Sequence, residues 1–163
     1  MANEIEYVCL FIFTETMDYS ILVRKTKGPT PDNPNGQAGR LNGIGGKMET
    51  CDYSSRDAVI REAQEECGVD IGSLDLRHFS TERYQYKAIV HYFYLKDQKI
   101  FNQLVDMRYT NDGDDFIVVK IDELLSEPSL SDYCVWNVPY LLLMSKILDC
   151  RELETRPVIY KPS

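Results

Sequence analysis

Three glutamates stand close together in the segment REAQEECG, residues 61–68. Glu62, Glu65 and Glu66 have the spacing i, i+3 and i+4, which places them on one helical face within an arc of about 100°. Like charges at this spacing destabilise a helix by a few tenths of a kcal/mol per pair, and no lysine stands four residues away to offset them. Carboxylate oxygens are the ligands that hard divalent cations prefer. The segment therefore predicts a Mg²⁺ site, against the alternative of a solvated acidic face.

A helix must hold these glutamates in place, and its two ends can be read from the sequence. Ser54 or Ser55 can cap its first turn, which Asp57 supports, and Gly68 suits the left-handed position that follows a helix. We expect a helix from about Ser55 to Cys67. A neighbouring stripe of apolar side chains can pack on a sheet: Val59, Ile60, Ala63 and Cys67.

The remaining elements are mostly strands. Runs of β-branched and aromatic residues predict strands at 5–13, 20–26, 76–84, 87–95 and 115–121, and a short strand that enters a glycine turn within 40–49. Residues 27–39, rich in proline and glycine, predict a long loop, either functional or disordered. DELL (122–125) predicts a short turn, and a late helix is expected over 135–150, interrupted or started around Pro139. One mid-chain helix and one late helix beside these strands predict an α+β or α/β sandwich.

Composition limits the class of protein. The length of 163 residues suits a single domain over 1–163, and 18 basic against 26 acidic residues give a net charge of −8, which disfavours a duplex nucleic-acid partner. The N-terminus lacks the pattern of a signal peptide, and no apolar stretch approaches the ~20 residues that span a bilayer. The five cysteines are scattered without a CxxC pair, so we expect a reduced, cytoplasmic protein without a zinc site.

The segment GGKMETCDYSSRDAVIREAQEECGVD resembles the Nudix box, G-x5-E-x7-R-E-U-x-E-E-x-G-U, where U is aliphatic. Two departures concern the loop before the helix. Asp52 stands in the place of the first glutamate, with Cys51 in place of the usual loop glycine, and eight rather than seven residues separate Asp52 from Arg61. The positions that match directly are Gly46, Arg61, Glu62, Glu65, Glu66, Gly68 and Val69, with Ala63 at the first aliphatic position.

The resemblance implies a mixed β-sheet between helices and hydrolysis of a nucleoside diphosphate linked to another group. Mg²⁺, or Mn²⁺ as an alternative, would be held by Glu62, Glu65, Glu66 and the carbonyl of Gly46, and would activate a water. Arg61 would orient the glutamates through a salt bridge.

The general base stays open among Glu62, Glu65 and an acidic residue of the loop NDGDDF, 111–116. In that loop Asp112, Asp114 and Asp115 are candidates, and the alternative is a plain Asx-Gly turn.

Residues outside the box suggest a substrate. AGRLNGIGGK (38–47) is similar to the segment before the box in oxidised-purine nucleoside triphosphatases of the MutT-like branch, where the asparagine at the place of Asn42 bonds the purine; a turn asparagine is the alternative. SLSDYCVWNVPYLLL (129–143) resembles the same branch and gives Asp132, Trp136 and Asn137 as nucleobase candidates, against a helix cap for Asp132 and a core position for Trp136.

Three cations on the strands could meet phosphate groups. Arg24 and Lys47 are the candidates, because the resemblance places them near the site. Lys25 is set aside as a solvated lysine, the commoner case.

We therefore expect a Mg²⁺-dependent hydrolase that converts purine nucleoside triphosphates, oxidised ones among them, to the monophosphate and pyrophosphate. The alternatives are another nucleoside diphosphate derivative, namely ADP-ribose, a dinucleoside polyphosphate or a capped RNA end, and a module that binds nucleotide or protein without turnover. The expected partner is a small nucleotide and no membrane. The oligomeric state stays open.

Overall fold

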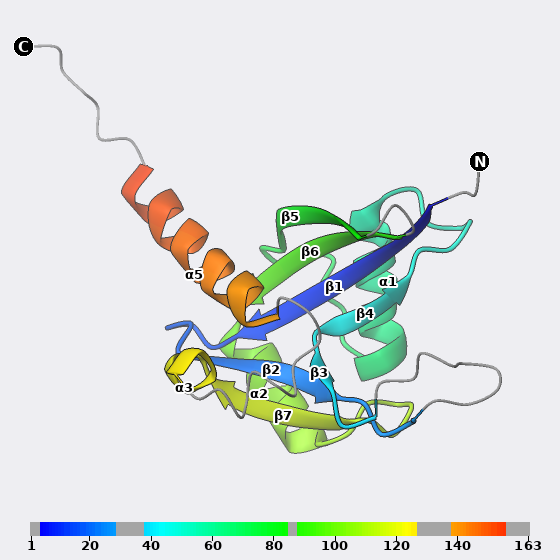
Figure 1. Ribbon diagram of the computed structural model, residues 1–163, viewed down its shortest axis with the longest axis horizontal. Coiled ribbons are helices and arrows are strands. Elements are labelled where there is room, and N and C mark those ends of the chain that lie inside the picture. Colours follow the sequence, from blue (N-terminus) through cyan, green and yellow to red (C-terminus); the bar gives the residue numbers. More distant parts are fainter. Residues whose placement is uncertain (1–3, 29–37, 85–87, 127–137, 156–163) are drawn as a thin grey trace, which may run out of the picture.

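The protein is a mixed β-sheet between two layers of helices (Figure 1). The computed structural model describes residues 4–28, 38–84, 88–126 and 138–155. The seven-stranded sheet has the order β3-β2-β1-β6-β5, with β4 paired to β1 and β7 paired to β2. The strands are β1 (Ile5–Phe13), β2 (Tyr19–Arg24), β3 (Leu41–Asn42), β4 (Ile44–Lys47), β5 (Arg77–Tyr84), β6 (Ala88–Lys96) and β7 (Asp115–Lys120). The helices are α1 (Ser55–Cys67), α2 (Gln98–Met107), α3 (Ile121–Ser126) and α5 (Val138–Thr155). The predicted sandwich class is confirmed.

The prediction of one mid-chain and one late helix was wrong, because α2 follows β6 directly. Asp97 caps α2 by accepting a hydrogen bond from the amide of Ile100 at 2.8 Å, and the helix buries Ile100, Phe101 and Leu104. Both the cap and this apolar spacing were present in the sequence. The DELL segment likewise forms a helix, α3, rather than a turn. The late helix continues to Thr155, beyond the expected end at residue 150, while residues 135–137 lie outside the described residues.

Two hydrophobic cores hold the three layers together. Helices α1 and α2 cover one face of the sheet, and α3 and α5 cover the other. Strand β1 contributes to both cores because successive side chains of a strand point to opposite faces. Its residues Val8, Leu10 and Ile12 belong to the first core, and Cys9, Phe11 and Phe13 to the second.

The sheet divides beside β1, and this division creates the site. The last residues of β1, Ile12 and Phe13, pair with β2, whereas residues 7–10 pair with β4. Strands β2 and β4 therefore diverge, and β3 pairs with the end of β2 at Val23 and Arg24. A Cβ atom at Gly45 would lie 2.0 Å from the carbonyl oxygen of Val8, so only glycine lets β4 run this close to β1. This gap between β2 and β4, bridged by β3, is called the fork below.

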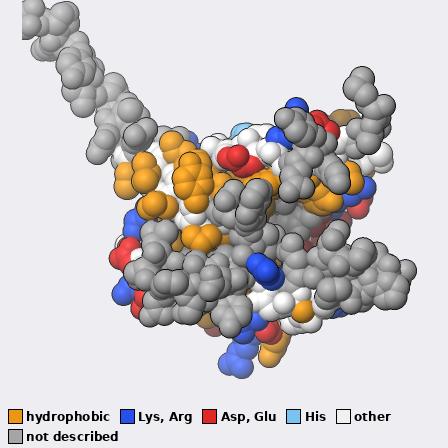
Figure 2. Space-filling model, in the orientation of Figure 1, with side chains coloured by type: hydrophobic (Ala, Val, Ile, Leu, Met, Phe, Trp, Pro, Cys, Tyr) orange, Lys and Arg blue, Asp and Glu red, His pale blue; other side chains and the backbone are white. Residues whose placement is uncertain are grey.

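Helix α5 keeps an apolar face toward solvent. Hydrophobic side chains gather on it in Figure 2, and Tyr140, Leu143 and Ile147 are exposed at helical spacing. None of the described helices is both long and apolar enough to span a bilayer.

Candidate functional site

Helix α1 carries the three glutamates and spans Ser55–Cys67, the predicted range. Ser54, rather than Ser55, is the N-cap and accepts a hydrogen bond from the amide of Asp57 at 3.1 Å. Gly68 ends the helix in the left-handed conformation, with φ of 66°. The apolar stripe packs on the sheet through Val59, Ala63 and Cys67, which are buried, and Ile60, which is partly buried.

Arg61 lies at the centre of the acidic cluster. Its Nη1 donates to Glu62 Oε1 and to Glu65 Oε2, both at 2.9 Å. Its Nε and Nη2 donate to the two oxygens of Asp52 at 3.0 and 2.9 Å, and Nη2 also donates to the carbonyl of Lys47 at 3.1 Å. The paired hydrogen bonds to Asp52 match the planar geometry of the guanidinium group, and Nη1 at the same time holds Glu62 and Glu65. The helix thus supplies its own charge relief, because Arg61 lies one turn before Glu65 in α1.

Asp52 takes the place of a glutamate despite the extra loop residue. Its Oδ2 also accepts the amide of Glu49 at 2.7 Å, and its own amide donates to the carbonyl of Glu49 at 3.0 Å. The hydrogen bonds from Arg61 hold the pKa of Asp52 below its usual value, against the burial of a side chain that is only 4% exposed. The longer loop thus brings a shorter carboxylate to Arg61.

Glu62 packs against the glycine turn of β4. A Cβ atom at Gly46 would lie 2.6 Å from Glu62 Oε1, so the carboxylate occupies the space that any other residue would fill. Burial raises the pKa of Glu62, and the contact with Arg61 offsets this only in part. The Glu62 carboxylate therefore lies beside the Gly46 backbone. Both are among the metal ligands that the resemblance implies.

Glu66 points into the fork rather than toward Arg61. Its Oε2 accepts the amide of Gly45 at 3.3 Å, and its Oε1 lies 3.9 Å from Lys25 Nζ. Burial raises the pKa of Glu66 to about 7, because the favourable contacts with Lys25 and Gly45 do not compensate for desolvation. Lys25, set aside on sequence grounds, is the cation that the fold brings to this carboxylate.

The loop before β7 closes the C-terminal end of α1. Asn111 donates from its amide to the carbonyl of Glu66 and from its side chain to the carbonyl of Glu65, both at 2.7 Å. Asp112 is exposed, and its charge contributes to the raised pKa of Glu66. Among the loop acids, Asp112 thus acts electrostatically on the cluster.

Asp114 has a supporting part in this loop. It is buried and accepts hydrogen bonds from Lys25 Nζ at 3.2 Å and from the amide and hydroxyl of Thr26, both at 2.9 Å. Burial opposes its ionisation, but these bonds lower its pKa below the usual value. Asp114 therefore fixes Lys25 next to Glu66.

The other predicted residues lie in different places. Asp115 is on β7 opposite Arg24 of β2, and neither lines the fork cavity described below. The Lys47 side chain is exposed, and only its carbonyl contacts Arg61. The nucleobase candidates of the late segment lie outside the described residues: Asp132, Trp136 and Asn137.

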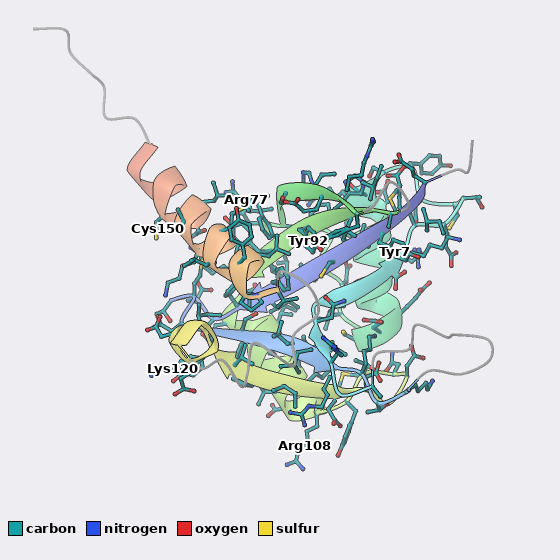
Figure 3. The ribbon with its side chains drawn as sticks, in the orientation of Figure 1. Tyr7, Arg77, Tyr92, Arg108, Lys120 and Cys150 are labelled. Carbon is teal, nitrogen blue, oxygen red and sulfur yellow. The ribbon has the colours of Figure 1, made fainter. Side chains whose placement is uncertain are left out.

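A cavity of about 350 Å³ opens beside the fork, on the sheet face opposite α1. The polar side chains of Asn42 and Lys25 line it, as does the backbone of Gly46. Its other wall is aromatic: Tyr7, Tyr84 and Tyr92 line it, and the hydroxyls of Tyr84 and Tyr92 lie 2.8 Å apart. Figure 3 shows Tyr7 and Tyr92 over β1 and β6. These tyrosines could not be identified as site residues from the sequence, because alternating aromatic residues are ordinary in strands.

The three glutamates have the chemistry of ligands for a divalent cation, but their carboxylates point in different directions. Among the described residues, no three His, Cys, Asp or Glu side chains are arranged to hold a metal ion. The geometry explains this, since Glu62 and Glu65 turn to Arg61 whereas Glu66 turns to Gly45 and Lys25. Yet burial raises the pKa of both Glu62 and Glu66, so their negative charge is under-compensated. Carboxylate oxygens whose charge is not fully compensated are suitable ligands for Mg²⁺.

Solved structures with the same fold come from several bacteria. A mutT/nudix family protein from Listeria innocua has a TM-score of 0.70 at 15% identity, with 94% of this chain and 99% of that chain covered. A Deinococcus radiodurans protein has a TM-score of 0.61 at 16% identity, covering 85% of this chain and 81% of that chain. A structure from a study of MutT from Aliivibrio salmonicida and Vibrio cholerae gives 0.52 at 16% identity, covering 79% and 94%. These likenesses concern the fold.

A comparison with curated proteins found no match. The family model of the NUDIX domain, however, matches residues 5–133, most of the chain. The match spans the glycine turn of β4, the glutamate face of α1 and the loop before β7. The chain therefore belongs to the NUDIX family of hydrolases.

Proposed function

We propose that this Nudix protein hydrolyses purine nucleoside triphosphates, including oxidised ones, with Mg²⁺. One water is consumed, the α–β anhydride is broken, and the products are the monophosphate and pyrophosphate. The observation that carries the proposal is the position of the cavity: Gly46 lines it, and the Glu62 carboxylate packs against Gly46. A base between the tyrosines would extend its phosphates past Lys25 toward the glutamates.

The charged residues would hold the metal, orient its ligands and contact phosphate, and Glu65 would have two roles. Glu62, Glu65, Glu66 and the Gly46 carbonyl would hold Mg²⁺, which neutralises phosphate charge and lowers the pKa of water when bound. Arg61 would release Nη1 contacts with Glu62 and Glu65 while its two bonds to Asp52 keep it in place. Lys25 would meet a phosphate at the mouth of the cavity, because Asp114 fixes it there.

Glu65 would be the general base, because its carboxylate is the most exposed of the three. Its side chain is 56% exposed, compared with 11% for Glu62 and 12% for Glu66. Water and substrate can therefore reach Glu65, whereas the other two carboxylates are enclosed by the turn of β4.

A substrate comparison tests the proposal. Pyrophosphate release with Mg²⁺ would be measured for dGTP, 8-oxo-dGTP, dATP and dCTP, and product formation for ADP-ribose and a dinucleoside tetraphosphate. We expect the rate of release from the purine triphosphates to exceed that from dCTP by roughly tenfold or more, the discrimination that a few contacts in a binding pocket provide. Turnover confined to ADP-ribose or the dinucleoside would retain the hydrolase family and contradict the triphosphate assignment.

A further inference from the structure

The last turn of α1 needs hydrogen-bond donors from outside the helix, because the final four carbonyl groups of a helix have no partner within it. The amide of Gly68, directly after the helix, donates to the carbonyl of Gln64 at 2.9 Å. The next two carbonyls belong to Glu65 and Glu66, the residues whose side chains form the glutamate face. Their donors come from a distant part of the chain.

Asn111 supplies a donor to each of these two carbonyls. Its backbone amide donates to the carbonyl of Glu66 and its side-chain Nδ2 to the carbonyl of Glu65, both at 2.7 Å. An ionised aspartate has no side-chain donor, so the acids that make up most of this loop could not form the second bond. Asn111 thus holds the backbone from which both carboxylates project.

The turn that carries Asn111, residues 110–114, is cross-linked to itself. The amide of Thr110 donates to the carbonyl of Asp114 at 2.8 Å, and the amide of Asp114 donates to the hydroxyl of Thr110 at 3.1 Å. The amide of Gly113 donates to the carbonyl of Thr110 at 3.0 Å, and a φ of 88° places Gly113 in the left-handed region that glycine adopts without strain. Because these bonds join its two ends, the turn moves as one unit.

The same turn reaches Glu66 a second time, through Lys25. Asp114 accepts a hydrogen bond from Lys25 Nζ at 3.2 Å, and that nitrogen lies 3.9 Å from Glu66 Oε1. The backbone of Glu66 is therefore held by Asn111, and its carboxylate faces a cation that Asp114 holds. One turn thus sets both ends of the Glu66 residue.

We propose that the 110–114 turn positions Glu66 for the metal ion, and that Asn111 is the positioning residue through which the turn acts on α1. The inference rests on the proposed function in one respect, namely that the glutamates of α1 hold the ion. It adds a supporting residue outside the Nudix box, and it gives this loop a part that does not depend on any of its acids being the general base. Residues that support metal ligands in this way change metal affinity roughly ten- to hundredfold.

Asn111→Ala tests the contact with α1. It removes the side-chain donor and leaves the backbone amide, so Mn²⁺ binding without nucleotide should weaken roughly tenfold, the lower end of that range. The electron paramagnetic resonance signal of free Mn²⁺ measures this. Asn102→Ala is the matched control, because it removes an exposed asparagine that bonds Gln98 within α2, and it should leave the affinity unchanged. Equal affinity in Asn111→Ala and the wild type would overturn the proposal.

Asp114→Asn tests the other end of the turn. The variant keeps an acceptor for Thr26 but weakens the hold on Lys25, which can then approach Glu66 and compete with the ion. Asp112→Asn removes the same charge from the same turn without a contact to Lys25, and it measures the purely electrostatic share. We expect Mn²⁺ binding to weaken more in Asp114→Asn than in Asp112→Asn, at an unfolding temperature near that of the wild type. Equal losses would contradict a positioning role for the turn.

Hydrogen exchange separates this proposal from the proposed hydrolysis, because it needs neither metal nor turnover. In chelator, the amide of residue 111 should be protected by its bond to the Glu66 carbonyl. Asn111→Ala should lower this protection roughly fivefold, the effect of losing one hydrogen bond of average strength. An unprotected amide in the wild type would overturn the proposal. Protection without any Mn²⁺ binding by the wild type would refute the metal site and the positioning role together, whereas Mn²⁺ binding that Asn111→Ala leaves unchanged would refute the positioning role alone.

Discussion

Single carboxylates in the site differ in how well their charge is compensated. Asp52 receives two guanidinium bonds and the pKa of its side chain is lowered, whereas burial raises the pKa of Glu62 and Glu66. Glu66 is the extreme case because burial outweighs its contact with Lys25, whose Nζ lies 3.9 Å away. An acidic group held in this state binds a proton or a metal ion more tightly than a solvated one.

Glu66 gives the metal-free protein a pH-dependent stability. Its pKa rises from 4.5 to about 7 on folding, so the folded state binds the proton more tightly than the unfolded state. The resulting stabilisation is complete below about pH 4.5 and is lost as the pH rises through 7, about 3 kcal/mol in total. Thermal unfolding in chelator should show the loss, and Glu66→Gln should remove most of it. An equal slope in the variant would contradict this assignment.

Added Mg²⁺ should act on the same group in the opposite sense. The ion competes with the proton, so its stabilising effect should be larger at pH 8 than at pH 5. The shift of the unfolding temperature by 10 mM Mg²⁺ measures this. Equal shifts at both pH values, or none, would contradict a metal site that includes Glu66.

Gly46 has a space requirement that can be tested separately from charge. Gly46→Ala would place a Cβ atom 2.6 Å from Glu62 Oε1, so the carboxylate must move away from the turn. We expect kcat/KM to fall by roughly tenfold or more, since misplacement of about 1 Å is costly in catalysis. Gly28→Ala is the control, because its Cβ would meet only Ala38 at 3.7 Å. Equal activity in the two variants would show that Glu62 is not held by this contact.

At the scale of elements, the loop from β4 to α1 carries the departure from the family pattern. An added residue allows aspartate to reach Arg61, with 4% of its side chain exposed. No rule of spacing would predict that the longer loop and the shorter acid compensate for each other. The loop before β7 was also ambiguous in sequence, because only the fold brings Asp112 toward Glu66 and turns Asp114 to Lys25.

Restoring the family's glutamate should therefore harm this protein. Asp52→Glu adds a methylene to an enclosed side chain that already accepts from Arg61 and the Glu49 amide. We expect a loss of about 1–3 kcal/mol in the free energy of unfolding from overpacking. Asp52→Asn keeps the size and removes the charge. It should lower activity, because Arg61 loses the carboxylate that holds it in place. Higher stability of Asp52→Glu, measured by urea unfolding, would show that the loop tolerates the family's residue.

The cap of α1 is a second test at this scale. Ser54→Ala removes the acceptor for the Asp57 amide and should cost about 1 kcal/mol of stability. Ser55→Ala, inside the first turn, is the matched control and should be nearly neutral. The opposite order would mean that the helix begins one residue later.

Local signals explain which elements could be predicted. Helix α1 has a serine cap, an apolar stripe and a terminal glycine, and its predicted bounds agree with the structure. Helix α2 also has a cap at Asp97, but it follows β6 directly, without glycine or proline to mark the boundary. The cavity wall could not be predicted because Tyr7 and Tyr92 become neighbours only through the parallel pairing of β1 with β6.

For the whole molecule, the divided sheet joins the two halves of the site. Cavity and glutamates lie on opposite faces of the sheet, and they meet at the fork, where Gly43, Gly45 and Gly46 leave little side-chain bulk. The net charge of −8 adds a long-range repulsion of polyphosphate, which Mg²⁺ bound to the substrate reduces.

The most direct test of this account is the Mg²⁺-dependent release of pyrophosphate from purine nucleoside triphosphates by the wild type and by Glu65→Gln. We predict turnover by the wild type that chelator abolishes, and a loss of roughly a hundredfold or more in the variant, with an unchanged unfolding temperature. Glu65 is largely exposed, so its replacement leaves the packing of α1 intact. Turnover by Glu65→Gln at the wild-type rate would contradict the central claim that the glutamate face of α1 is the catalytic centre.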